Sequence, residues 1–390
     1  MKRRRSNRAV LLIASALLTA HSVSADDAKD PVVGGKALSA WAKDVAGEDA
    51  DAAKAARAVL SRAGQAAVPA LSSLVQGNSV AAIGFACDVL AALGPDATAA
   101  VPALIGRLDG EGVDWAAARA LERVGESAVH PLATALTSET PVVRMHAARI
   151  LGRLGATARG GLDALLVATR DRDLLVRTEA VRAIGLIALE PERSVPALVK
   201  ALATPNDEVR ATTAEAIGRF GRAATSAEPA LIQITSDSDA TVRAFAFAAL
   251  VVTGDGPGDV GPAAIAALDD ADENVRAAAV AVLGARRVRA DALAERLLAL
   301  AKDPSRTVRG AAARAARGVG ATFAEAMPAL IGLLSDAHPP VVVDAIDAIS
   351  AYGPDAAAAL PELRKDRFAA HPDAVVRGKV AAAIRAITGK

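Results

Sequence analysis

The chain has few aromatic side chains and a single cysteine. Phenylalanine, tryptophan and tyrosine together make up 2% of its 390 residues, so stacking on sugars or nucleobases has little material to work with. Because Cys87 is alone, no internal disulfide can form and packing must supply the stability. The hydrophobic fraction of 52% is mostly alanine, valine, leucine and isoleucine, which suits close contact between helices.

The sequence also lacks the patterns of common catalytic and metal sites. Beyond Ala25 its histidines are scattered singly, at His130, His146, His338 and His371. No HExxH pair or Cys/His metal spacing occurs, and no GxSxG motif marks a serine hydrolase. Cys87 falls where a small core residue is expected. We therefore predict no catalytic residue, no metal and no cofactor.

The N-terminal segment differs in character from the rest of the chain. Five Lys and Arg residues up to Arg8 precede the apolar run Ala9–Ala20, and Val23–Ala25 places small residues where a signal peptidase cleaves. This apolar run is too short to cross a bilayer, which takes roughly 20 residues. We predict a signal peptide over residues 1–25, cleaved after Ala25, with no membrane span afterwards. The destination would be the periplasm, the cell surface or the extracellular medium.

The charge balance argues against a nucleic-acid partner. Residues 1–25 hold five of the 45 basic residues and no acidic one, which leaves 40 Lys and Arg against 44 Asp and Glu. A protein that binds nucleic acid or an anionic membrane needs a dominant basic surface. We therefore expect a protein partner instead.

The most informative pattern is a regular interval between arginines that each follow a valine. They recur every 33 positions, at Arg144, Arg177, Arg210, Arg243, Arg276 and Arg309. Prolines such as Pro196 and Pro229, and glycines such as Gly221 and Gly254, keep the same interval. Such a period indicates one supersecondary unit repeated along the chain. Neighbouring units stack to bury a core that no single unit could bury, which predicts one elongated solenoid.

One repeat reads as helix, turn, helix, turn. A first helix, A, is expected to start at Pro196, because a proline is tolerated in the first turn of a helix. The polar stretch at 204–207 ends it, and Asn206 is placed to cap a second helix, B, which Gly221 terminates. Good capping types recur four positions before the arginine, at Asp173, Asn206, Asp239, Asp272 and Ser305.

These motifs resemble HEAT repeats, in particular the short subclass found in phycobilisome-lyase-like (PBS lyase) proteins. The match is carried by Pro-Ala-Leu at 196–198, Val-Arg at 209–210 and Ile-Gly at 217–218. The resemblance implies an all-α fold, a right-handed α-solenoid of the armadillo type. It also implies that the recurring arginines are structural and form a ladder of hydrogen bonds to aspartates between neighbouring repeats.

The expected solenoid covers residues 26–390 in about eleven two-helix repeats. Irregular N-terminal repeats are expected over 33–125, a regular array over 128–320 and C-terminal repeats over 325–390. Irregular ends are typical of capping repeats.

Positions that differ from repeat to repeat are not dictated by stacking. Five positions after the arginine stand Arg149 and Arg182, and nine after it stand Arg153 and Arg219. These positions lie off the apolar stripe and should face solvent. In HEAT-like solenoids the B helices line the concave surface, so the resemblance would bring the four arginines together. Phe245, in a neighbouring stretch of small residues, is a candidate apolar anchor.

We predict a non-enzymatic scaffold that binds a protein partner, with an acidic segment, through this concave surface. A merely solvated surface, with Glu179 and Glu215 interspersed among the arginines, would explain the same charges. Two other hypotheses remain open. One is a lyase-type enzyme related to bilin lyases, in which the same repeat subclass occurs, and the other is a purely structural spacer of the cell envelope.

Overall fold

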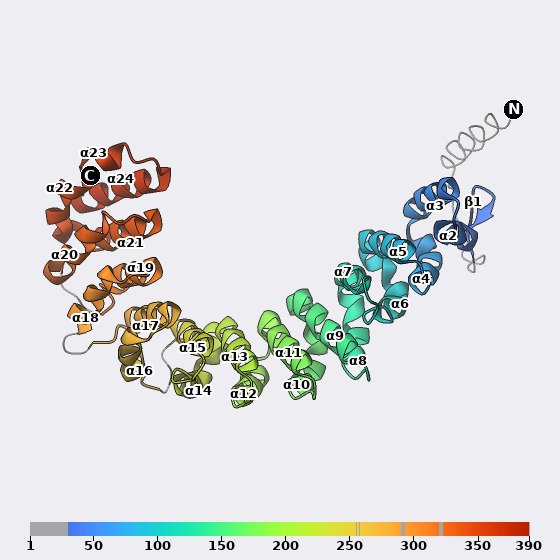
Figure 1. Ribbon diagram of the computed structural model, residues 1–390, viewed down its shortest axis with the longest axis horizontal. Coiled ribbons are helices and arrows are strands. Elements are labelled where there is room, and N and C mark those ends of the chain that lie inside the picture. Colours follow the sequence, from blue (N-terminus) through green and yellow to red (C-terminus); the bar gives the residue numbers. More distant parts are fainter. Residues whose placement is uncertain (1–29, 255, 257, 290–292, 320–322, 390) are drawn as a thin grey trace. The chain divides into compact units, whose positions relative to one another are not determined.

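The computed structural model describes residues 30–389 except 255, 257, 290–292 and 320–322 (Figure 1). The predicted signal peptide and its cleavage site at Ala25 lie outside the described residues. The chain divides into two compact units, unit 1 (Met1–Ile187) and unit 2 (Ala188–Lys390). Apart from one short hairpin, the regular elements of the described residues are helices, so the predicted all-α solenoid is confirmed.

Unit 1 begins with a hairpin of β1 (Val32–Val33) and β2 (Lys36–Ala37), in which Val32 pairs with Ala37. Five helix pairs follow. Their first members are α2 (Leu38–Ala46), α4 (Val68–Val75), α6 (Val101–Ile105), α8 (Val129–Ala135) and α10 (Leu162–Ala168). Their second members, the B helices, are α3 (Ala50–Arg62), α5 (Val80–Leu93), α7 (Asp114–Val124), α9 (Pro141–Leu154) and α11 (Leu174–Ile187). Short 3-10 helices connect four repeats to the next: η2 (Gly64–Ala67), η3 (Gly94–Ala100), η4 (Gly125–Ala128) and η5 (Gly155–Gly161).

Unit 2 contains six further pairs. Its first members are α12 (Pro191–Ala201), α14 (Glu228–Ile234), α16 (Gly261–Ala266), α18 (Leu293–Ala299), α20 (Phe323–Leu333) and α22 (Leu360–Leu363). The B helices are α13 (Asp207–Arg219), α15 (Ala240–Thr253), α17 (Glu273–Ala285), α19 (Arg306–Ala315), α21 (Pro339–Ser350) and α24 (Ala374–Thr388). The short elements are η6 (Gly221–Ala227), η7 (Ala267–Asp269), η8 (Leu300–Lys302), η9 (Gly353–Ala359) and α23 (Asp366–Ala369).

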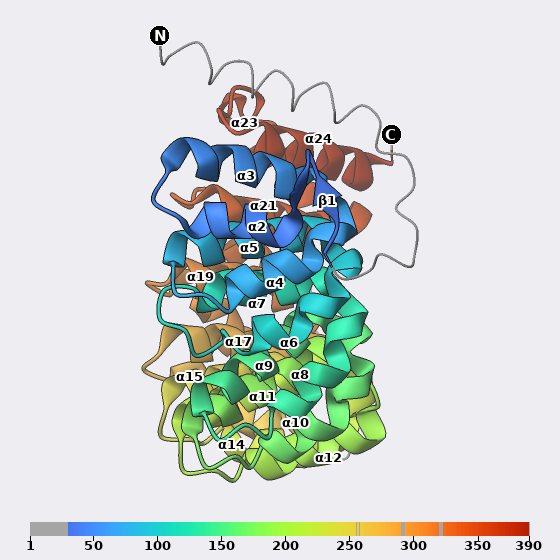
Figure 2. The ribbon, with the colours of Figure 1, turned by 90° about the vertical axis from the view of Figure 1, so that its right-hand side faces the viewer.

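Within each unit the B helices form one layer, because each contacts the B helix of the next repeat. In unit 1 this layer runs through α5, α7, α9 and α11, and the first helices α4, α6, α8 and α10 form the other layer (Figure 1 and Figure 2). The core between the layers consists of leucine, valine, isoleucine and alanine. Small residues let the B helices approach closely: a Cβ added to Gly152 of α9 would lie 2.8 Å from Cα of Ala183 in α11.

Local sequence explains where the helices begin. The predicted N-cap residues Asn206, Asp239, Asp272 and Ser305 each accept a backbone N–H of the following turn with their side chain, which satisfies donors that have no partner within the helix. One prediction was wrong in detail. Helix α12 begins at Pro191, so Pro196 lies inside the helix instead of starting it, because Pro191 already supplies the first-turn proline.

Five of the six recurring arginines bind the turns of two successive repeats. Arg243 donates from Nε and Nη2 to both carboxylate oxygens of Asp270, each at 2.9 Å, and from Nη1 to the carbonyl oxygens of Asp237 and Ser238. Asp270 in turn accepts the backbone N–H of Asp272. The same bidentate pairing occurs in Arg144–Asp171, Arg210–Asp237, Arg276–Asp303 and Arg309–Asp336. This ladder is the structural role that the resemblance implied.

Arg177, the remaining arginine of the series, has no such aspartate partner among its hydrogen bonds to the described residues. Arg177 donates to the carbonyl oxygens of Asp171 and Arg172 in its own repeat. The residue 27 positions further along, where the other five arginines have their aspartate, is Thr204.

One apolar stretch, Val80–Ile105, is long and hydrophobic enough to span a membrane by length and composition alone. The structure instead bends this stretch at Gly94, whose φ of 60° is left-handed, into α5, η3 and α6. Leu90 and Leu104 are fully buried in the core. We therefore assign the stretch to the interior of the solenoid.

Candidate functional site

Each B helix exposes one side, which we call the B-helix face. On α9 this face carries Val142, Met145, Arg149 and Arg153, because residues three or four apart lie on the same side of a helix. The other sides of α9 are buried, as at Ile150. The face therefore consists of positions that stacking leaves free to vary.

Three of the four predicted arginines meet in a pocket between α9 and α11, which we call the arginine pocket. Arg149 Nη2 and Arg182 Nη1 both donate to Oε1 of Glu179, at 3.3 and 2.7 Å. Arg153 lies beside them and donates from Nη1 to Oε1 of Glu122 on α7, at 2.9 Å. Gly152, Ala183 and Leu186 complete the lining of a cavity of about 140 Å³.

The acidic and basic side chains of this pocket lie at different depths below the surface. The Glu179 side chain is only 10% exposed, whereas that of Arg153 is 60% exposed. The glutamates lie beneath the arginines, so the guanidinium groups face solvent. A buried carboxylate that fixes two arginines also restricts their rotamers, which lowers the entropy cost when a ligand binds them. The pocket can therefore present preordered donors to an anionic group.

The other two predicted residues belong to unit 2. Arg219, on α13, donates to Oε1 of Glu215 one turn earlier at 2.8 Å, and both side chains are well exposed. The interspersed glutamates that the sequence analysis considered, Glu179 and Glu215, thus both pair with candidate arginines.

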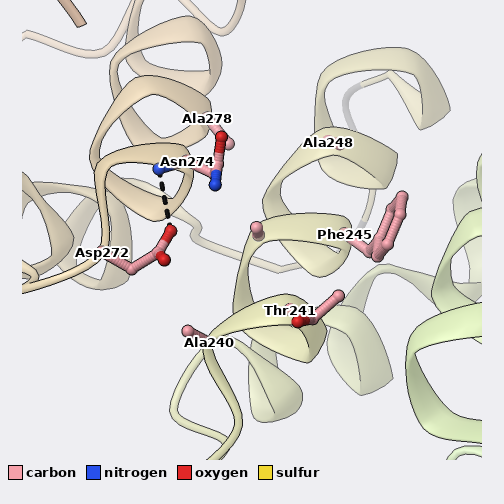
Figure 3. Close-up of a pocket in the computed structure, with 8 residues that line it drawn as sticks. Ala240, Thr241, Phe245, Ala248, Asp272, Asn274 and Ala278 are labelled. Carbon is pink, nitrogen blue, oxygen red and sulfur yellow. Dashed lines mark hydrogen bonds between the residues drawn. The ribbon is translucent and has the colours of Figure 1, made fainter. Parts of the chain in front are cut away.

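Phe245 lines a second cavity, of about 370 Å³, between α15 and α17 (Figure 3). Its lining residues are almost all small and uncharged: Ala240, Thr241, Ala244, Phe245, Ala248, Asp272, Asn274 and Ala278. Asp272 is the exception, and its Oδ1 is engaged in capping, since it accepts the backbone N–H of Asn274 at 2.8 Å. The half-buried Phe245 thus lines a cavity in which Asp272 is the one charged residue.

A row of exposed apolar side chains, Trp115, Val142 and Leu175, lies on the B-helix face of unit 1 and was not predicted from the sequence. Their common position could have revealed them, because each is the second residue of its B helix.

We assign no binding role to the buried side chains of His146 and Cys87. His146 is buried, its Nε2 lies 3.4 Å from Oδ2 of Asp114, and its Nδ1 has no hydrogen-bond partner. Burial, and secondarily the charge of Arg149, lower the pKa of His146. Cys87 is fully buried, and burial raises the pKa of its thiol to about 11, so the thiol stays protonated. Within the described residues, no group of three or more His, Cys, Asp or Glu side chains is arranged to hold a metal ion.

Comparison with known families agrees with the repeat geometry. A family model of HEAT repeats matches residues 111–185, 129–218, 162–251, 195–284, 261–324 and 294–385, which together extend from 111 to 385. The chain belongs to the HEAT-repeat family. No curated protein matches this HEAT-repeat chain.

Several solved structures share the fold. Importin beta is 16% identical, with a TM-score of 0.59 over 98% of this chain and 57% of its own. Kap121p, bound to the extreme C-terminus of the protein phosphatase Cdc14p, is 14% identical, with a TM-score of 0.64 over 90% of this chain and 46% of its own. Kap95p, in a structure with RanGDP, is 15% identical, with a TM-score of 0.57 over 99% of this chain and 58% of its own. The HEAT-repeat chain thus spans about half the length of these proteins, and identities this low show a common fold alone.

Proposed function

We propose that this HEAT-repeat protein is an exported, non-enzymatic scaffold that binds a protein partner through its B-helix face. The fold supports a binding role, because HEAT-type solenoids present large preformed surfaces. Kap121p, which shares the fold, holds the C-terminal segment of another protein. By analogy, the B helices of this chain would line the concave surface that receives the partner.

The arginine pocket supports an acidic segment in that partner. Its guanidinium groups face outward over the buried Glu179, and each uses only part of its five donors in the ion pairs already described. A carboxylate of the partner would bind to the remaining donors without first having to order the arginines. The outward position of the guanidinium groups is the observation that carries the proposal.

The test measures binding of a fluorescein-labelled peptide rich in glutamate and serine by anisotropy. The Arg153→Gln and Arg182→Gln double variant of residues 26–390 should bind at least about tenfold more weakly, because charge-assisted contacts are worth about 1.5–3 kcal/mol each. The control is Arg314→Gln, which removes a similarly exposed arginine that is ion-paired with Asp344 in unit 2.

Equal binding by wild type and the double variant would reject the arginine pocket as the site. Equal weakening by Arg314→Gln would show a general charge effect instead. A crosslinking pull-down from envelope and secreted fractions, repeated with the same variants, extends the test to natural partners. A partner captured by wild type and Arg314→Gln but lost by the double variant would support the proposal.

Export is the second part of the proposal, and it is supported by the basic start, the apolar run and the small residues up to Ala25. Expression in the native host followed by fractionation and mass spectrometry of the intact chain tests it. A mature N-terminus at Asp26 in the exported fraction is expected. An uncleaved chain confined to the cytosol would refute export without affecting the binding test.

A further inference from the structure

Three large apolar side chains are exposed in a row on the B-helix face of unit 1. Trp115, Val142 and Leu175 are 59%, 46% and 56% exposed. They are the second residues of α7, α9 and α11, and each of these helices contacts the next. We call them the apolar row. Scattered single exposures need no explanation, but apolar side chains aligned on adjacent helices are typical of interaction sites.

Stacking does not require apolar residues at this position. In unit 2, the second residues of the first four B helices are polar: Glu208, Thr241, Asn274 and Thr307. The same helix turn therefore forms equally well with a polar side chain facing solvent. The second residue of α24 in unit 2, Val375, is exposed as well, but the B helix before it has Pro340 there. Large apolar side chains at this position of three successive B helices are therefore found in unit 1.

The two edges of the apolar row differ in charge. One edge lies toward the turns that precede the helices. It carries the exposed acidic residues Asp109, Glu111 and Glu139, and Arg172 lies close to Glu139. On the other side the Arg119 guanidinium lies over the Trp115 ring, 5.2 Å from its centroid, and pairs with Asp88. The arginine pocket lies further along α9 and α11 in the same direction. One edge is thus mainly acidic and the other exposes guanidinium groups.

We propose that the apolar row binds an amphipathic helix of a protein partner. Packed helices lie about 8–10 Å apart, and seven residues of an α-helix rise about 10.5 Å. Apolar residues at every seventh position would therefore reach Trp115, Val142 and Leu175 in turn. Basic residues along one side of the stripe and acidic residues along the other would match the two edges of the row.

This inference rests on the proposed function only in that both place binding on the B-helix face of unit 1. Its apolar anchors, Trp115, Val142 and Leu175, lie outside the arginine pocket, which contributes only to the basic edge of the row. Either can therefore fail while the other holds.

Trp115 provides a direct signal for the test. The chain has two tryptophans, and Trp41 is buried, so a Trp41→Phe variant of residues 26–390 reports on Trp115 alone. The probe is a helical peptide with three leucines, one at every seventh position, with lysine on one side of this stripe and glutamate on the other. Binding should shift the Trp115 emission to shorter wavelength, and a scrambled peptide of the same composition should not do so.

Anisotropy of the labelled peptide then measures affinity. The Val142→Ser and Leu175→Ser double variant should bind about tenfold or more weakly, as expected when central apolar anchors are lost. The control is Val167→Ser, which changes a strongly exposed valine on α10, outside the B-helix face. Circular dichroism must show unchanged helix content in both variants.

Four results would overturn the proposal. The scrambled peptide could bind as tightly, or Val167→Ser could weaken binding as much as the double variant, and either would indicate non-specific hydrophobic contact. Phosphatidylglycerol vesicles, but not the helical peptide, could shift the emission, which would assign the row to a lipid surface. The emission could also shift with protein concentration alone as a dimer forms in sedimentation experiments, which would assign the row to a second copy of this chain. Failure of the glutamate-rich peptide to bind would concern the arginine pocket only.

Discussion

Replacing one ladder aspartate should remove a pH-dependent part of the stability that comes from a single ion pair. Asp336 accepts two hydrogen bonds from Arg309, at 2.6 and 3.0 Å, and one from the backbone N–H of His338. The hydrogen bonds from the Arg309 guanidinium, together with the one from the His338 N–H, hold the pKa of Asp336 at about 2, against an ordinary value of 3.8. The carboxylate side chain is only 6% exposed, so solvent screens the pair weakly.

The lowered pKa sets the size and sign of the effect. A fall in the pKa of Asp336 from 3.8 to about 2 corresponds to about 2 kcal/mol of folding free energy. This contribution is complete above the pKa of the unfolded chain and is lost as the pH falls through the pKa of the folded chain. About half of it should remain at pH 3 and little at pH 2. Asp336→Asn should therefore destabilise the protein by about 2 kcal/mol at neutral pH, and the gap to wild type should close on acidification.

Urea unfolding followed by circular dichroism at pH 7, 5, 3 and 2 measures this gap. Urea is preferred to guanidinium chloride, which would screen the ion pair. Asp355→Asn, at an exposed position of η9, controls for the general loss of an acidic residue. The reasoning fails if Asp336→Asn costs no more than Asp355→Asn at pH 7, or if the gap to wild type is the same at pH 7 and pH 2.

Two further predictions concern the effect of single substitutions on thermal stability. Gly284→Ala should destabilise the protein by about 1–3 kcal/mol, because the added Cβ would lie 2.7 Å from Cβ of Ala315. The same change at Gly332, where nothing lies within 4 Å, should stabilise α20 by up to about 1 kcal/mol, and thermal unfolding that shows equal effects would contradict the steric argument. Burial lowers the pKa of His146, so folding stability should fall as the pH drops below the ordinary value of 6.5, when the unfolded chain takes up a proton more readily. His146→Gln should lose this component, and melting curves at pH 7 and pH 5 that change in parallel for both proteins would refute it.

The sequence predicted most of the fold because the repeat constrains it at several levels. A helix N-cap, a Val-Arg pair and a glycine at fixed spacing each determine a local structure, and their common period requires them to stack. Asn206 and Asp272 could be identified as caps because capping depends on the next few residues only. Helix starts were less certain, as Pro196 shows, since either of two prolines could begin α12.

The candidate site could be predicted only in part. Helical periodicity identified Arg149, Arg153 and Arg182 as exposed, because that follows from position within one repeat. The pairing of Arg149 with Glu179 and of Arg153 with Glu122 instead joins side chains of neighbouring repeats, and the relative depth of the two charges depends on packing. The sequence could not show that the glutamates lie beneath the arginines, which decides the sign of the charge that a partner meets.

This layering also determines which arginine can be changed to test binding without unfolding the site. Glu179 is nearly buried and shared by Arg149 and Arg182, so removing both would leave a buried carboxylate without a cation, which costs several kcal/mol. Arg153 pairs instead with Glu122, a more exposed partner, and its loss should affect stability little. Changing Arg153 and Arg182 together keeps Arg149 on Glu179. A loss of binding by that double variant, at unchanged stability, would therefore come from the exposed donors themselves.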